Sequence, residues 1–148
     1  MKFIKFIFIS KIVFLLFLGS ACRAEQGEAS LVRNAKNSMQ TLMTGLITYK
    51  WDYDKLPSGK TIEILKELLR IYGDDQPFFQ AHRAMIEKGV GILDPWGIPY
   101  EIFISSKDEI FIISSGPDKD FASEKRIILY RKAMPISQTP KAADLLRI

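Results

Sequence analysis

Residues 94–120, DPWGIPYEIFISSKDEIFIISSGPDKD, decide the fold of this chain. The motif at 94–97 predicts a tight turn, because proline presets φ at the second turn position and glycine accepts a positive φ near its end. The β-branched and aromatic runs at 102–104 and 110–113 predict two strands, and the four polar residues between them predict a β-hairpin. Residues 114–120 then form an acidic turn. We interpret the stretch as architectural, with a candidate cation-binding loop at its end.

Length and charge favour one small domain and argue against a nucleic-acid partner. The chain has 148 residues, enough for a single modest core. Three of its 21 Lys and Arg residues lie in the first 21 positions, where no acidic residue occurs, so the remainder carries 18 basic and 17 acidic side chains. That balance lacks the clustered basic face that nucleic acid requires. The single cysteine excludes an intramolecular disulfide framework.

The first 21 residues have the features of an export signal peptide. Lys2 and Lys5 precede an apolar stretch that is interrupted at Ser10-Lys11 and resumes as a core at 12–18, and the small residues Gly19-Ser20-Ala21 follow it. The core is too short to span a bilayer, which takes about 20 residues. Small residues directly before Cys22 resemble the bacterial lipobox, in which the cysteine is diacylated, although glycine stands where leucine is usual. We therefore predict that Cys22 carries a lipid, which attaches a protein to a membrane without spanning it.

Two alternatives to lipidation stay open. Ordinary cleavage near Ala21 or Ala24 would leave Cys22 without a role. The stretch 3–21 could instead remain uncleaved as a membrane anchor, with Lys11 as an unfavourable charge within it.

Downstream of the leader, apolar periodicity predicts a long helix. Residues 22–29 are polar and predict a tether. From Ser30, the expected N-cap, apolar residues recur at steps of three and four. They are Val32, Ala35, Met39, Leu42, Met43, Leu46, Ile47, Tyr49 and Tyr53. The helix should end near Asp54, because Pro57 disfavours helix in the residue before it.

Two shorter helices are expected before the hairpin. The first is capped by Thr61 and runs to Gly73, a plausible C-cap. The second, weaker one covers 78–88 and contains His82, the one histidine of the chain. No cysteine, second histidine or serine elbow lies near His82 in the sequence, so we expect no catalytic or metal-binding role for it.

Three motifs together resemble a known family. Residues 46–57, LITYKWDYDKLP, are similar to the end of the long helix in the major, G-type pseudopilins of type II secretion systems. Residues 94–100 match that family's Asp-Pro-Trp-Gly-x-Pro-Tyr turn, and 114–118 match its Ser-x-Gly-x-Asp segment. The order and spacing agree over residues 30–127. The matching turn residues are Asp94, Pro95, Trp96, Gly97, Pro99 and Tyr100.

The resemblance implies an α+β fold in which a long N-terminal helix packs on a three-stranded antiparallel sheet, with one or two short helices between. The third strand would be 127–130. The pseudopilin-like domain would span 30–132, followed by a C-terminal extension, 133–148. Family members assemble into a periplasmic filament that works in protein export, and they are not enzymes.

The leader departs from the family pattern. Pseudopilins carry a prepilin signal that precedes the apolar segment from which the filament core is built. Here the apolar segment comes before the small-residue cleavage motif, so cleavage would remove it. We therefore expect an anchored interaction domain on the periplasmic side of the bacterial cell envelope. The alternative is a genuine pseudopilin subunit held in the membrane by its uncleaved N-terminus.

A second departure concerns calcium in the loop after the second strand. The resemblance implies a Ca²⁺ site in which Asp118 is a ligand. Further oxygens would come from Ser115, Asp120 and Glu124. Calcium needs six to eight oxygen ligands, whereas Lys119 stands where glycine is usual and residues 125–126 are Lys-Arg where paired aspartates are usual. The alternative is a turn whose Asp118 hydrogen-bonds its own backbone.

These observations favour a protein-interaction module over an enzyme. The expected partners are secretion or pilus components, or another envelope protein, and no nucleic acid, small-molecule substrate or firm cofactor is predicted. Aromatic residues are enriched at interfaces, so Trp51, Trp96 and Tyr100 and the face of the long helix are candidate contacts. A small periplasmic enzyme is the least favoured alternative, because the sequence shows no paired carboxylates in a pocket, phosphate loop or zinc spacing.

Overall fold

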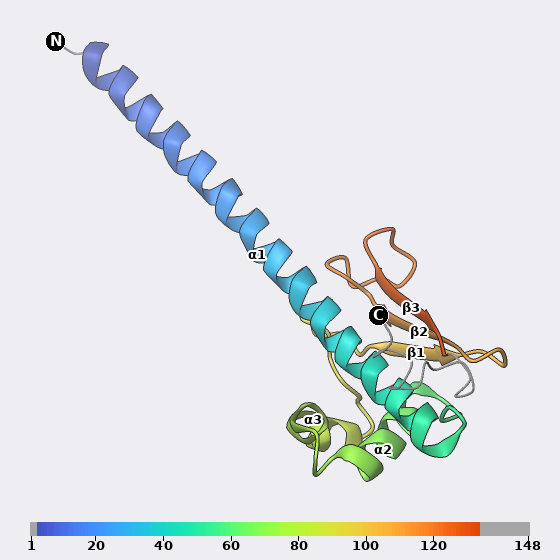
Figure 1. Cartoon of the computed structure of the whole chain (residues 1–148). Coiled ribbons are helices and arrows are strands. Elements are labelled where there is room, and N and C mark those ends of the chain that lie inside the picture. Colours follow the sequence, from blue (N-terminus) through green and yellow to red (C-terminus); the bar gives the residue numbers. More distant parts are fainter. Residues whose placement is uncertain (1–2, 134–148) are drawn as a thin grey trace, which may run out of the picture.

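The computed structural model describes the backbone of residues 3–133 and the side chains of residues 27–133. Its elements are α1 (Phe3–Tyr53), α2 (Thr61–Tyr72), α3 (Pro77–Glu87), β1 (Glu101–Ile104), β2 (Glu109–Ser114) and β3 (Ile127–Lys132). Figure 1 shows the C-terminal half of α1 against the domain and its N-terminal half projecting away from it. The predicted α+β fold is confirmed.

The three strands form one antiparallel sheet in the order β1-β2-β3. The predicted hairpin is present, with the four polar residues 105–108 joining β1 to β2. The third strand is also present and extends two residues beyond the predicted 127–130. Side chains alternate between the two faces of a strand, so Ile110 and Ile112 are buried against the helices while Phe111 between them points to the other face.

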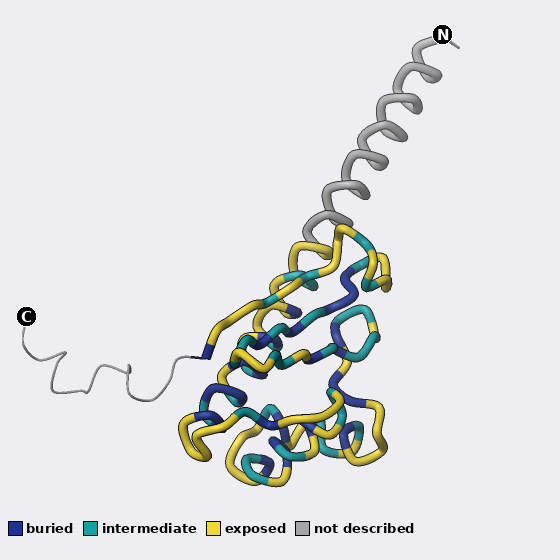
Figure 2. Tube along the Cα trace, turned by 90° about the vertical axis from the view of Figure 1, so that its right-hand side faces the viewer, coloured by how far each residue is buried: buried dark blue, intermediate teal, exposed yellow. Residues whose placement is uncertain are grey.

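One core lies between α1, the two short helices and the inner face of the sheet, and buried positions line these facing surfaces in Figure 2. On α1, Met39, Leu42, Met43 and Leu46 are at most 1% exposed, which accounts for the steps of three and four in the sequence. Burying a side chain of this size contributes about 1.5–3 kcal/mol relative to leaving it exposed. The sheet therefore packs on the apolar face of α1.

The start of α1 differs from the prediction. The helix is continuous from Phe3, so residues 22–29 belong to it and Ser30 is an interior position and not an N-cap. Residues 22–29 are rich in Ala, Glu, Gln and Arg, which are good helix formers, and no proline interrupts them. The polar side chains of this segment predict a tether, but polar residues with high helix propensity continue a helix. Among the described residues, no helix is both long and apolar enough to cross a membrane.

The predicted cap of α2 was also wrong. Lys60 holds the N-cap position, and its backbone N–H donates to Oε2 of Glu63 at 2.7 Å. The Thr61 hydroxyl faces the sheet instead, where it accepts a hydrogen bond from the Ile102 N–H at 2.9 Å and donates to the Ile102 carbonyl at 3.3 Å. Thr61 thus attaches α2 to β1. The expected bounds of α3 agree with the structure within one residue.

A buried lysine ties the end of α1 to the hairpin. Lys50 is 8% exposed, and its Nζ donates to the Asp54 carbonyl at 3.2 Å and to Oδ2 of Asp108 at 3.0 Å. Asp108 lies in the β1–β2 connection, and its carbonyl accepts from the Ala133 N–H at 2.9 Å. A single loop residue therefore holds the helix end and the end of β3 together.

The contact between α1 and α3 yields a stability prediction. A Cβ placed on Gly45 would lie 3.0 Å from Cζ of Phe79, whereas one on Gly27 would meet nothing within 4 Å. Gly45→Val should lower the free energy of unfolding by about 1–3 kcal/mol through overpacking, and Gly27→Val on the same helix should change it little. Urea denaturation of the two variants measures the difference, and equal losses would contradict the packing assigned to Gly45.

Candidate functional site

Asp94 is a buried carboxylate that joins the turn to the end of β2. It is 4% exposed. Its Oδ1 accepts hydrogen bonds from the backbone N–H groups of Trp96 at 3.0 Å and Ile98 at 2.9 Å. Its Oδ2 accepts from the hydroxyls of Ser114 at 2.7 Å and Ser115 at 3.1 Å. Four hydrogen bonds compensate the carboxylate for its lost hydration.

The backbone of the turn is closed by its own hydrogen bonds. The Gly97 N–H donates to the Asp94 carbonyl at 3.0 Å, and the Asp94 N–H donates to the Ile98 carbonyl at 2.8 Å. Gly97 has φ +86°, a left-handed conformation that glycine adopts without the strain a Cβ would cause. Leu93 and Pro99 form a bridge across the turn, which directs the chain into β1.

Tyr100 is a core residue and not a partner contact, which corrects its place among the candidate contacts. It is 1% exposed, and its hydroxyl donates to the Ala35 carbonyl of α1 at 3.4 Å. Burial raises the pKa of the Tyr100 phenol to about 12, so it stays protonated as a donor. Trp96 is half-buried, while Trp51 is 53% exposed and stays available to a partner.

The outer face of the sheet carries an exposed aromatic row that the sequence reasoning missed. Phe103, Phe111 and Tyr130 are direct cross-strand neighbours on β1, β2 and β3. Phe103 and Tyr130 are 52% and 50% exposed, and Ile128 beside them is 47% exposed. The rings of Phe111 and Tyr130 lie with centroids 5.0 Å apart. We call these four residues the aromatic face; exposed apolar patches of this kind mark interaction sites.

A signal for the aromatic face was present in the sequence. The strands are apolar at successive positions, as in residues 102–104 and 110–113, and such runs are typical of strands covered on both faces. Within residues 27–133, the helices pack on the face that carries Ile110 and Ile112, and Phe103 and Tyr130 on the other face are exposed.

The candidate calcium ligands are placed in different interactions. The Ser115 hydroxyl is buried against Asp94. Oδ2 of Asp118 accepts from the Ser123 hydroxyl at 2.7 Å, and its Oδ1 lies 3.5 Å from Nζ of Lys125. Calcium ligands must converge on one point, and these side chains are directed elsewhere.

The remaining loop carboxylates do not complete a cage. Oδ1 of Asp120 accepts from the Ala122 N–H at 2.8 Å, so Asp120 makes the local backbone bond that the alternative assigned to Asp118. Glu124 is exposed. Among the described residues, no group of three or more His, Cys, Asp or Glu side chains is placed to hold a metal ion. The residues present do not fit a six-to-eight-oxygen calcium site.

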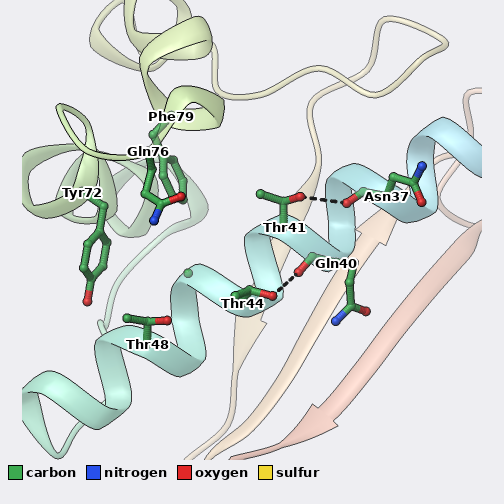
Figure 3. Close-up of a pocket in the computed structure, with 9 residues that line it drawn as sticks. Asn37, Gln40, Thr41, Thr44, Thr48, Tyr72, Gln76 and Phe79 are labelled. Carbon is green, nitrogen blue, oxygen red and sulfur yellow. Dashed lines mark hydrogen bonds between the residues drawn. The ribbon is translucent and has the colours of Figure 1, made fainter.

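A groove between α1 and the two short helices is lined by neutral polar side chains, shown in Figure 3. Its volume is about 410 Å³, and its lining is Asn37, Gln40, Thr41, Thr44, Gly45, Thr48, Tyr72, Gln76 and Phe79. The hydroxyls of Thr41 and Thr44 donate to carbonyls one turn earlier on α1. Tyr72 donates to Oδ2 of Asp52 at 2.6 Å, and burial raises its pKa. The groove lining therefore combines hydroxyl and amide groups with the ring of Phe79, and Tyr72 links it to the carboxylate of Asp52.

Cys22 and His82 are the two remaining residues that the sequence analysis singled out. Cys22 lies within α1, and its side chain is outside the described residues, as are residues 134–148 of the expected extension. His82 packs edge-on against the ring of Phe78 with centroids 5.0 Å apart, and burial lowers its pKa.

The comparisons with known proteins agree with this architecture. A family model described as type II secretion system (T2SS), protein G, matches residues 23–128. Because the match covers most of the chain, the chain belongs to this family, and the resemblance stated from the three motifs is confirmed. Its role is related to that of a type II secretion pseudopilin, in the cell envelope. Comparisons with curated proteins and with solved structures gave no match.

The four hydrogen bonds of Asp94 predict a large effect on stability. Asp94→Ala should lower the free energy of unfolding by at least about 3 kcal/mol, because it removes hydrogen bonds to a charged acceptor and leaves buried donors unpaired. Asp94→Asn should cost less, since one oxygen remains and the serine hydroxyls can accept from the new amide. Chemical denaturation tests this, with the exposed Asp75→Ala as a control expected within about 0.5 kcal/mol of wild type. If Asp94→Ala had the same free energy of unfolding as wild type, the stabilising role assigned to the Asp94 hydrogen bonds would be contradicted.

Proposed function

We propose that this protein is an exported, non-enzymatic interaction module of type II secretion or type IV pilus-like machinery, held at the periplasmic side of the envelope by a lipid on Cys22. The observation that carries the proposal is the aromatic face, an apolar surface that is exposed among the described residues 27–133, on a member of a secretion family. The non-enzymatic part is supported by the family, whose members are structural proteins.

Two observations support the lipid anchor. Gly19-Ser20-Ala21 directly precede Cys22, as in a lipobox. The family match begins at residue 23, the position after that cysteine. Processing before Cys22 would leave the matched region intact behind the lipid.

A membrane-anchored pseudopilin subunit is the second candidate. The continuity of α1 from Phe3 to Tyr53 favours it, because an unbroken helix would connect an uncleaved N-terminus to the domain. Ordinary cleavage near Ala21 or Ala24, with no lipid on Cys22, is the third candidate.

The anchor is tested on the mature protein. Wild-type protein should incorporate radioactive palmitate and show a shift in gel mobility when lipoprotein signal peptidase is inhibited, and Cys22→Ala should do neither. Mass spectrometry of the N-terminal peptide then separates the candidates. A modified Cys22 supports the lipoprotein, an N-terminus at Met1 supports the anchored subunit, and an unmodified N-terminus near Ala24 supports ordinary cleavage.

The aromatic face is the proposed docking surface, and its occupant is another protein of the secretion or pilus machinery. Glu101 and Glu109 lie on the same face of β1 and β2, beside the aromatic row. Lys132 lies opposite Glu109 on the same face, so a complementary partner surface would combine apolar side chains with charged ones of both signs. Trp51, at the end of α1, is a separate exposed aromatic outside this face.

Docking predicts a selective loss of the partner. In crosslinked pull-downs from envelopes, Phe103→Glu should reduce recovery of secretion or pilus components at least about tenfold, the loss expected for a central aromatic contact. The matched control is Val90→Ser, which alters an apolar residue that is 43% exposed but lies between α3 and the turn. Quantitative mass spectrometry, with melting temperatures to confirm folding, provides the measurement. Equal recovery from Phe103→Glu and wild type would exclude the aromatic face as the docking surface.

A further inference from the structure

The loop between β2 and β3 is tightly closed at its base. Gly116 has φ +73°, and a Cβ on it would overlap the carbonyl oxygen of Lys125, so the two ends of the loop are in backbone contact. Lys119 adopts φ +57°, the left-handed conformation that glycine adopts most easily, and its N–H donates to the Gly116 carbonyl at 3.1 Å. This backbone requires a favourable interaction to hold it.

Three successive carbonyl groups of the loop converge on one cation. Nη1 of Arg126 lies 3.4 Å from the carbonyl oxygen of Phe121 and 3.3 Å from those of Ala122 and Ser123. Converging carbonyl oxygens are the donor set that a hard metal ion takes in protein loops. Here the guanidinium of Arg126, an exposed residue, contacts all three oxygens.

A second cation neutralises the loop carboxylate. Nζ of Lys125 lies 3.5 Å from Oδ1 of Asp118, and the Ser123 hydroxyl donates to Oδ2 of the same group. The lysine and this aspartate are largely exposed, so their ion pair contributes little by itself. The ion pair engages the Asp118 carboxylate, which the family resemblance assigned to calcium as a ligand.

We infer that the loop 116–126 is closed by the chain's own cations, chiefly Arg126, in the place that the resemblance gives to Ca²⁺, so that the fold is independent of calcium. The inference stands on the loop geometry and does not depend on the proposed docking function. It follows from the same two residues, Lys125 and Arg126, whose positive charge repels a divalent ion.

Thermal denaturation of the full chain tests the independence from calcium. The melting temperature of wild type should be the same in millimolar Ca²⁺ and in EGTA, because an ion that does not bind cannot stabilise the folded state. A higher melting temperature in millimolar Ca²⁺ than in EGTA would overturn the inference.

The role of Arg126 is tested by Arg126→Gln. This variant should lower the melting temperature by about 5 °C in both solutions and speed amide hydrogen exchange within residues 116–126 selectively. The matched control is Arg131→Gln, which removes an exposed arginine from β3 and should leave exchange in the loop unchanged. Loop exchange in Arg126→Gln equal to that of wild type would overturn the assignment.

Discussion

Asp94 accepts hydrogen bonds from segments 20 residues apart, two from the turn that follows it and two from the serines that end β2. Because the carboxylate is buried, each of these donors must be in place for the charge to be tolerated. The network fixes where β1 starts relative to where β2 ends, and it directs Tyr100 against Ala35 of α1. The Asp94 network therefore positions the sheet on the helices together with the Lys50–Asp108 ion pair and the Thr61–Ile102 hydrogen bonds.

Once the inner face of the sheet is placed on α1, the other face keeps large apolar side chains exposed within the part of the chain that the structure describes. The domain buries Ile110 and Ile112 on one side and exposes Phe103 and Tyr130 on the other. A small domain gains little stability from leaving large aromatic side chains in water, so a surface of this kind is best explained by a partner. The exposed aromatic face is therefore the feature of this fold on which the proposed interaction function rests.

The loop after β2 illustrates how one architecture can be maintained by different chemistry. Carbonyl oxygens that lie around one point accept from the donor or cation found there, and a metal ion or a guanidinium can fill that place. In this chain Arg126 contacts the carbonyls of residues 121–123, and Lys125 is next to Asp118. The departures from the family pattern noted in the sequence thus have a common structural reason.

The sequence by itself determined the elements whose signals are local. The hairpin, the short helices and the third strand follow from apolar runs, helix periodicity and turn residues, and the three motifs at 46–57, 94–100 and 114–118 together indicated the family. Local reasoning failed at the start of α1, where polarity was given more weight than helix propensity.

Only the tertiary structure decided which side chains meet. Thr61 bonds to Ile102, 41 positions away, and not to its own helix, and Ser115 bonds to Asp94, 21 positions away. Likewise Tyr100 is buried while Phe103 is exposed, although both are aromatic residues at the start of the same hairpin. A local pattern shows that a strand is apolar, but the packing of distant segments decides which of its faces is covered.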